Sequence, residues 1–454
     1  MSSQVAAPQI TISPKNTGLW GVSQNEEAAK LTGHLLEKDL TMLHHILALY
    51  GTGANAKQLQ WAFDLRHELQ RPAESRSDDV IAKLSQDWSN AREYLGKEEH
   101  YPNFLAYFQK LISIHGYEQV VKNFLMRGDA AADGLLVRLH AGVLHPLIQL
   151  MYGLEWKEPA IVAEALAQTC VHQVESLDQL LLASEYSVAP SAPQMPALLD
   201  MFYRARNLSS LDGATQFQDE NKIEDGILQR AKEPMLSILR DVRVQDNELE
   251  ERTSEMFHTI ILVASSAAIH PPHHVKYDFF LMHHVNSALL YLTTLDAPWL
   301  SRREKCRLLE WKIRMDLIQY VARGRPHINT EGIMFYEPKR PSRESIREIG
   351  KRLQDFGDDG HGIKQGRATA ICHELMASWK HRSWAILNDD ATWIKIQHMV
   401  VDALEVPGPL YVRSAGFQEA WQDAPPHGTP PQSPEQLHML QTGSGSSAEA
   451  LASA

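Results

Sequence analysis

The sequence predicts an all-α protein, folded as a single large multi-helical domain. Apolar residues recur at three- and four-residue intervals in residues 35–50, 80–95, 120–128, 197–205 and 308–324. This spacing is typical of helices that bury one face. Sustained alternation of apolar and polar residues, which indicates half-buried strands, is almost absent, and we find no repeat of 30–50 residues.

Composition along the chain predicts three regions. Residues 1–17 are polar and lack periodicity, which indicates a flexible N-terminal arm. Residues 18–421 form the helical domain, in which Pro- and Gly-containing stretches at 189–196 and 323–326 separate helices. Residues 422–454 are rich in Pro, Gly and Ser, and we expect a disordered tail.

Charge and cysteine content exclude several classes of protein. Lys plus Arg number 44 against 56 Asp plus Glu, a net charge of -12, which argues against nucleic acid or an anionic membrane as a partner. Cys170, Cys306 and Cys372 form no C-x-x-C pair, so a disulfide framework or a thiolate zinc site is not expected. With no signal-peptide pattern and no run of 18 apolar residues, we expect a cytoplasmic protein.

Histidine is abundant, at 22 residues, and clusters in apolar helical segments. A single buried histidine is more often a core residue that hydrogen-bonds a carbonyl. Several buried imidazoles each need partners for two nitrogens, and a shared metal satisfies several at once. Adjacent histidines point about 100° apart on a helix, so the sequence leaves open which member of each pair binds the metal. The four segments contain His44 and His45, His140 and His145, His283 and His284, and His361 with Lys364.

The fourth segment, residues 358–379, is the most informative. Asp358 and Asp359 can cap a helix, which places His361 in its first turn. Lys364 is three residues further and shares the face of His361. A solvent-facing lysine is the ordinary interpretation, because an ammonium has no lone pair for a metal. A lysine carbamate formed with CO2 would instead bind a hard metal through oxygen.

Other catalytic motifs are absent or weak. The segment GTGANA at residues 51–56 follows a helix and lacks the third glycine of a dinucleotide fingerprint. No phosphate-binding loop, H-E-x-x-H or G-x-S-x-G occurs, so no flavin or NADPH site is visible. His270, His273 and His274 surround a Pro-Pro turn and are interpreted as loop residues, with a peripheral metal contact left open.

At these segments the chain resembles the questin oxidase-like family of fungal secondary metabolism. The matching motifs follow one another over nearly 380 residues. They are H-H-x-L-x-L-x-x-x-G-A (44–54), H-P-x-I-x-x-x-Y-G-x-E (145–155), D-F-F-L-M-H (278–283), D-D-G-H-x-x-K-x-x-R-A (358–368) and V-R-x-x-G-F-x-x-A-W within 411–421.

The resemblance implies a non-haem iron site in a central cavity. The family includes anthraquinone-cleaving dioxygenases whose iron is held by four histidines and a carboxylated lysine. Carried onto this chain, the ligands are His45, His145, His283, His361 and carbamylated Lys364, with His44, His140 and His284 as alternatives. Five protein ligands leave one octahedral position, so we expect the Lys364 carbamate to be labile and able to act as a base toward a substrate phenol.

Two positions depart from the family pattern. Gln149 stands where many relatives have a second histidine. Asn286 stands where threonine is expected, one turn after His283 and on the same face. Asn286 is therefore expected to adjoin the site and to affect substrate orientation or oxygen access.

The resemblance implies that the chain opens the central ring of a hydroxylated anthraquinone, or of its anthrahydroquinone, to a benzophenone carboxylic acid. Fe(II) and the Lys364 carbamate are the expected cofactors, O2 is the co-substrate, and an aromatic polyketide is the partner. One alternative is a Baeyer–Villiger-type monooxygenase that needs NADPH. Another is a non-catalytic helical protein that binds a polyketide. The substrate, the pathway and the oligomeric state are not fixed by the sequence.

Overall fold

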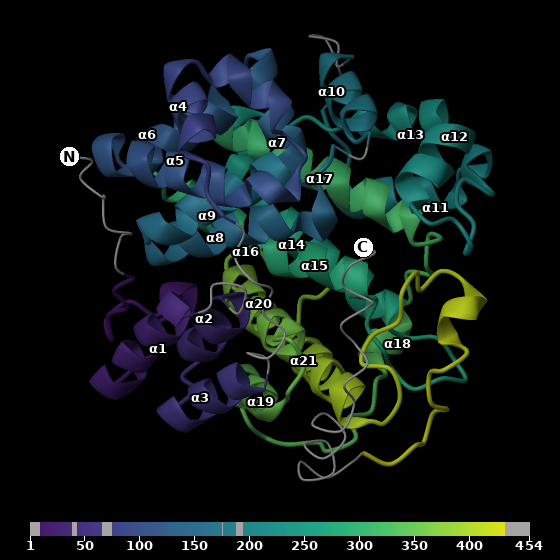
Figure 1. Ribbon diagram of the computed structural model, residues 1–454. Helices are drawn as coiled ribbons and strands as arrows, with labels where there is room; N and C mark the ends of the chain where they lie inside the picture. Colours follow the sequence, from purple (N-terminus) through teal and green to yellow (C-terminus); the bar gives the residue numbers. More distant parts are fainter. Residues whose placement is uncertain (1–9, 39–42, 66–74, 175, 188–193, 432–454) are drawn as a thin grey trace. The chain divides into compact units, whose positions relative to one another are not determined.

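A computed structural model describes residues 10–38, 43–65, 75–174, 176–187 and 194–431. Helices dominate these residues, joined by short 3-10 and π-helical turns (Figure 1). Within the described ranges there is no β-strand, and pairing is limited to two isolated bridges, His273 with Pro426 and Asp278 with Val412. The predicted all-α class is confirmed.

The helices divide into two compact units. Among the described residues, unit 1 comprises those within 10–178 and 296–300, and unit 2 those within 179–295 and 301–431. The sequence analysis treated residues 18–421 as one domain. Helical periodicity reveals the buried face of each helix but not which other helix that face contacts, so this division is not visible in the pattern.

Unit 1 is built around α8 and α9, which pack against each other, and α9 also packs against α5. A second cluster of α1, α2 and α3 joins α8 through α2. The helices of unit 1 are α1 (Glu26–Lys38), α2 (Leu43–Gly51), α3 (Ala56–Asp64), α4 (Asp78–Gln86), α5 (Tyr101–His115), α6 (Tyr117–Val121), α7 (Ala130–Leu139), α8 (His145–Trp156) and α9 (Pro159–Val171).

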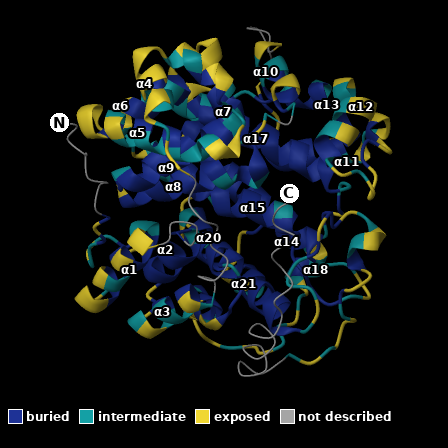
Figure 2. Ribbon diagram, viewed as in Figure 1, coloured by how far each residue is buried: buried dark blue, intermediate teal, exposed yellow. Residues whose placement is uncertain are grey.

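Unit 2 is built around α14, α15, α17 and α20, and α15 packs against each of the other three. These helices are buried over most of their length (Figure 2). The helices of this part of the chain are α10 (Asp178–Tyr186), α11 (Leu198–Asn207), α12 (Leu228–Arg230), α13 (Lys232–Leu239), α14 (Leu249–Ala267), α15 (Phe279–Ser287), α16 (Leu289–Leu295), α17 (Arg302–Ala322), α18 (Thr330–Met334), α19 (Ile346–Lys351), α20 (His361–Met376) and α21 (Asp390–Glu405).

Local sequence fixes where α15 and α20 begin. Asp278 caps α15 by accepting hydrogen bonds from the N–H groups of Phe280 (2.9 Å) and Leu281 (3.0 Å). Before α20, Gly360 adopts a left-handed φ of 82°, which glycine accommodates without strain. The Asp358 carboxylate then accepts the Gly362 N–H at 2.6 Å. His361 is the first residue of α20, as predicted, but the predicted aspartate N-cap is wrong: the N-cap is Gly360, which makes no side-chain cap hydrogen bond, and Asp358 reaches the first turn from two residues earlier.

One predicted helix is interrupted, and another includes residues that are not described. Residues 80–95 read as one helix, but α4 ends at Gln86 because the Asp87 side chain accepts the Ser89 N–H and starts a 3-10 helix, Trp88–Glu93. Residues 35–50 contain the end of α1 and nearly all of α2, and residues 39–42 between them lie outside the described ranges.

Both predicted terminal regions are partly described. In the predicted arm, residues 1–9 lie outside the description, whereas Ile10 and Ile12 are buried. In the predicted tail, residues 432–454 lie outside it. The earlier tail residues are attached to the loop of residues 270–274, since the Pro425 carbonyl accepts the His274 N–H at 2.7 Å.

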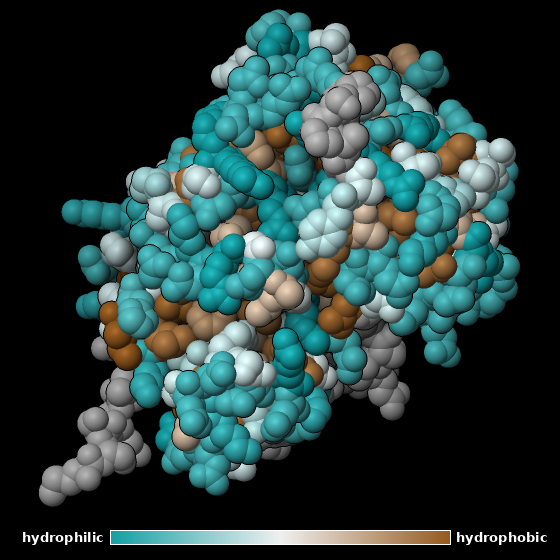
Figure 3. Space-filling model, turned by 90° about the horizontal axis from the view of Figure 1, so that it is seen from above, coloured by the Kyte–Doolittle hydropathy of each residue, from teal (hydrophilic) through white to brown (hydrophobic). Residues whose placement is uncertain are grey.

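Within the described residues, no single helix has both the length and the apolar composition to cross a membrane, although the bent pair Ala130–Leu139 and Gly142–Trp156 does so jointly. The face drawn in Figure 3 is covered mainly by hydrophilic residues with scattered hydrophobic ones. This distribution agrees with a chain of net charge -12.

Candidate metal centre

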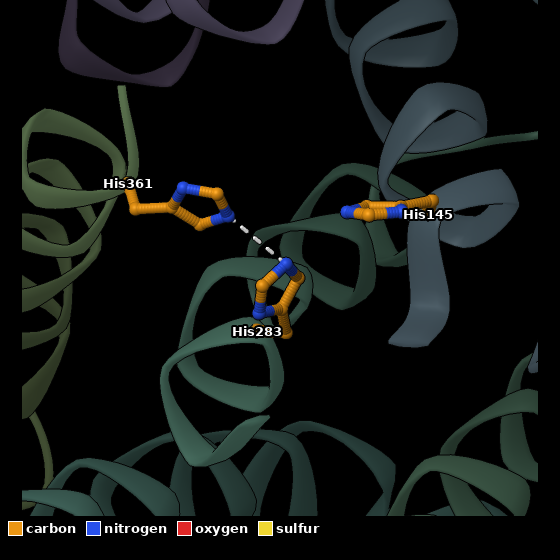
Figure 4. A group of neighbouring side chains, drawn as sticks. All are labelled: His145, His283 and His361. Carbon is orange, nitrogen blue, oxygen red and sulfur yellow. Dashed lines mark hydrogen bonds between the residues drawn. The ribbon is translucent and has the colours of Figure 1, made fainter. Parts of the chain in front are cut away.

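Two histidines of unit 2 face each other where α15 packs against α20 (Figure 4). The Nε2 atoms of His283 and His361 are 3.0 Å apart, and the ring centroids are 4.6 Å apart. The exposed fractions of these residues are 0% and 4%, so both side chains are buried. Figure 4 also draws His145, a residue of unit 1.

Each imidazole is oriented through its other nitrogen. His283 Nδ1 lies 2.6 Å from the backbone carbonyl of Phe279, one turn earlier on α15. His361 Nδ1 bonds the carboxylate of Asp359, just before α20. A carbonyl and an ionised carboxylate only accept, so both Nδ1 atoms carry the proton and donate.

This arrangement places two acceptor nitrogens next to each other. With Nδ1 protonated in both neutral rings, both Nε2 atoms are acceptors, and acceptors 3.0 Å apart repel unless a cation lies between them. Two nitrogens bound to one metal at about 2.1 Å and at a right angle lie ~3.0 Å apart. Metal-binding histidines also typically donate Nδ1–H to a carbonyl or carboxylate. The pair therefore has the geometry of two neighbouring metal ligands.

The adjacent His284 forms a hydrogen bond with a residue of another helix. Its Nδ1 lies 2.6 Å from the Asp316 carboxylate on α17, and Asp316 also pairs with the buried Lys312. Burial lowers the pKa of His284, an effect that the bond to Asp316 opposes. Of the two residues that the sequence left open, His283 is the one that faces His361.

Lys364 lies on α20 one turn after His361 and is 5% exposed. No hydrogen bond or ion pair from its ammonium to another described residue is present. Burial lowers the pKa of Lys364, and the nearby Asp359 and Asp358 partly oppose this shift. A lysine in this setting has more neutral amine, the form that reacts with CO2, than an exposed one.

Asn286 lies on α15, one turn after His283, and is 1% exposed. Among the described residues, neither its amide oxygen nor its amide nitrogen has a hydrogen-bond partner. Leaving a buried amide unsatisfied costs roughly 1–3 kcal/mol. Such an amide is suited to bonding a small molecule, and its position beside the site stays a prediction.

The predicted ligands of unit 1 lie on α2 and α8, which pack together. His45 on α2 is 2% exposed. The alternative His44 stacks on the ring of Tyr152 of α8, with centroids 5.3 Å apart. His145 is the first residue of α8 and is half-buried. Its alternative, His140, bonds the Leu136 carbonyl at 2.9 Å within the preceding helix.

Gln149, where the family pattern has histidine, has a partner in unit 1. Its amide nitrogen donates to the Glu164 carboxylate of α9 at 2.9 Å, and both residues are buried. The side chain thus joins α8 to α9. A cavity of about 150 Å³ elsewhere in unit 1, lined by Trp88, Phe124 and Arg127 among others, is small for a three-ring ligand.

The loop histidines attach the C-terminal segment. His270 stacks on Trp421 with centroids 4.6 Å apart, and His273 bonds the Ala424 carbonyl at 3.0 Å. His274 bonds the Asp402 carbonyl at 3.1 Å. Their interpretation as loop residues around the Pro-Pro turn is confirmed.

Several residues around the histidine pair were not predicted from the sequence. Phe279 was only part of a family motif, yet its carbonyl orients His283 and its ring contacts both imidazoles. Asp359 was interpreted as a helix cap, but it bonds His361. Tyr411 donates to Asp358 at 2.5 Å. For the segment around Tyr411, the sequence offered only the V-R-x-x-G-F motif, which does not indicate what this segment contacts.

Comparison with known proteins matches residues 41–369 to the family model described as questin oxidase-like. A questin oxidase of Aspergillus fumigatus is 32% identical over 395 residues, covering 84% of this chain and 87% of the relative. A questin oxidase of Aspergillus terreus is 28% identical, covering 91% and 97%.

A third relative, a Baeyer–Villiger monooxygenase of Cryptosporiopsis sp., is also 28% identical, covering 92% of this chain and 99% of the relative. The matched region includes every histidine of the predicted ligand set and Lys364. The chain belongs to the questin oxidase-like family.

Proposed function

We propose that this chain is an iron-dependent dioxygenase that opens the central ring of a hydroxylated anthraquinone, taken in its anthrahydroquinone form, to a benzophenone carboxylic acid. The main support is the opposed pair of Nε2 atoms on His283 and His361, each oriented by a bond at Nδ1. The family and the oxidase names of the relatives supply the reaction class.

The donor set fits iron. Imidazole and carboxylate-like oxygen are ligands that Fe(II) accepts in oxygenases. In unit 2 the ligands are His283, His361 and the carbamate of Lys364. The resemblance assigns two more, His45 and His145, to unit 1. Iron, when bound, would supply the activation of O2.

The remaining residues orient the metal ligands and the substrate. Asp359 and the Phe279 carbonyl keep both imidazoles in the tautomer whose Nε2 is free to bind metal. The Lys364 carbamate would accept a proton from a substrate phenol. The Asn286 amide would hydrogen-bond the quinone or phenol oxygen and so fix the orientation of the ring.

The fate of O2 tests the reaction. An anthrahydroquinone plus one O2 gives a hydroxybenzophenone carboxylic acid: one C–C bond of the central ring breaks, one oxygen atom enters the carboxyl group, the other becomes a new phenol hydroxyl, and no further reductant is needed. Mass spectrometry after reaction of the reduced substrate with labelled O2 is therefore expected to show two labelled atoms in one product molecule, without NADPH. One labelled atom with consumption of NADPH would favour the Baeyer–Villiger alternative. Tight binding without turnover would favour a non-catalytic polyketide-binding protein.

The same assay on Asn286→Thr addresses the departure from the family pattern. Asn286 is placed beside a ligand, so iron content should remain near wild type while KM or the relative rates on different anthrahydroquinones change. Loss of most of the bound iron in this variant would show that the assigned role is wrong.

A further inference from the structure

A positively charged side chain lies one aromatic ring away from the histidine pair. The guanidinium of Arg413 is 4.6 Å from the centroid of the Phe279 ring. The ring of Phe279 is in turn 4.6 Å from that of His283 and 5.1 Å from that of His361. Arg413 is exposed, and no hydrogen bond or ion pair links its side chain to another described residue.

The backbone holds Arg413 in this position. Val412 donates to the Tyr277 carbonyl at 3.0 Å, and the Val412 carbonyl accepts the Phe279 N–H at 2.9 Å. On the other side, the Ala415 N–H donates to the Asp278 carboxylate at 2.8 Å. The residue is thus fixed against the start of α15 from both sides, so its position beside Phe279 is built into the fold.

A second arginine lies beside it. Arg323 follows the last residue of α17, and its guanidinium is 3.9 Å from the centroid of Phe280, whose ring also lies 6.0 Å from the guanidinium of Arg413. Arg323 is only 6% exposed, and its side chain makes no hydrogen bond or ion pair with any described residue. Burial lowers the pKa of Arg323 to about 10, with Asp278 opposing the shift and Arg413 adding to it.

Positive charge is in excess around Arg323 and Arg413. The ammonium of Lys222 also repels Arg323, and it is satisfied by the carbonyls of Phe217 (2.8 Å) and Asp219 (3.1 Å). Two carboxylates offset these cations: Asp219 acts on Lys222, and Asp278, whose oxygens accept backbone N–H groups, acts on Lys222 and Arg323. A buried guanidinium without an anionic partner is costly, and a bound anion would remove that cost.

We propose that Arg323 and Arg413 form a binding site for an aryl oxyanion, the phenolate of the substrate or the carboxylate of the ring-opened product. A guanidinium binds oxyanions through paired N–H groups. The ring of Phe279 lies against Arg413 and that of Phe280 against Arg323, and both rings offer an apolar surface to the aryl group. The identity of the aryl ligand rests on the proposed function, but the anion site itself does not.

Binding of 2-benzoylbenzoate tests the site without requiring turnover. Titration calorimetry compares this acid with its neutral methyl ester, in iron-loaded and in iron-free protein, because a carboxylate can also bind a metal. Arg413→Gln is expected to weaken binding of the acid about tenfold or more in both forms, with little effect on the ester. The affinity of Arg413→Lys for the acid should lie between those of wild type and Arg413→Gln, since lysine keeps the charge but lacks the planar guanidinium.

The matched control is Arg303→Gln, an exposed arginine on the first turn of α17 in the same unit, which should bind like wild type. Arg323→Lys, which keeps a buried cation, should weaken acid binding if the protein retains its melting temperature. A parallel titration with 2-hydroxyanthraquinone and its methyl ether measures the phenolate. If the variants lose affinity only for an ionised ligand, the anion site is supported. Whether the acid or the phenolate is affected identifies which oxyanion the site binds.

The proposal is overturned if Arg413→Gln binds both ionised ligands as wild type does. It is also overturned if the ionised and neutral ligands weaken equally, since that result indicates a packing role for Arg413. Selective loss of acid binding in a protein that fails to cleave anthrahydroquinones would leave the anion site standing and remove the proposed reaction instead.

Discussion

Replacing either histidine of the opposed pair is expected to remove iron from the protein. In His283→Ala and His361→Ala, the remaining Nε2 loses the neighbour 3.0 Å away with which it would share the metal. Iron content should fall from about one per chain to near zero, and turnover of anthrahydroquinone by at least ~100-fold, since loss of an orienting partner alone typically costs 10–100-fold. Metal analysis and single-turnover assays measure both effects.

Two comparisons separate metal loss from unfolding. His381→Ala removes an exposed histidine of the same unit and should behave like wild type. Added Fe(II) should raise the melting temperature of wild type, because a ligand that binds only the folded state stabilises it, but not that of His283→Ala. Normal iron content and activity in both His283→Ala and His361→Ala would show that the pair does not bind the metal.

Lys364→Ala is expected to lose activity and to weaken iron binding. The amine is buried and lies one turn from His361 on the same face of α20. An ammonium there would repel Fe(II), and a buried charge without a partner is strongly destabilising. A carbamate removes the cation and supplies an anionic oxygen. Lys364→Glu should therefore retain more iron than Lys364→Ala, although its shorter side chain is expected to leave turnover low.

Bicarbonate provides an independent readout of the carbamate. Wild type stripped of CO2 should regain iron and activity faster when bicarbonate is supplied, whereas Lys364→Ala should not respond. Lys380→Ala, an exposed lysine just beyond α20, is the control and should match wild type. Normal turnover in Lys364→Ala, or intact mass showing unmodified lysine in active protein kept under CO2, would refute the role.

The helices could be predicted because each one repeats its own buried pattern. The residues at which helices end depend on single capping side chains, and apolar periodicity does not reveal these. Asp87 ends α4 by capping the next turn, although residues 80–95 continue the apolar spacing. The division into two units was not predictable either, because it arises from contacts between distant segments.

The site was predictable as a set of segments, not as contacts. The sequence did not show which of His283 and His284 faces the site, since the hydrogen-bond partner of His284 is Asp316, 32 positions later on α17. Arg413 was invisible for the same reason, because it reaches Phe279 through a chain pairing more than 130 residues apart. Local motifs identify which residue types are present, whereas the fold decides which of them meet.

Metal analysis of wild-type protein purified without chelators tests directly whether the chain is an iron enzyme. We expect about one iron per chain, loss of activity on chelation, and recovery with Fe(II) but not with Zn(II). Full activity in protein that contains no metal, or that contains stoichiometric zinc in place of iron, would contradict it.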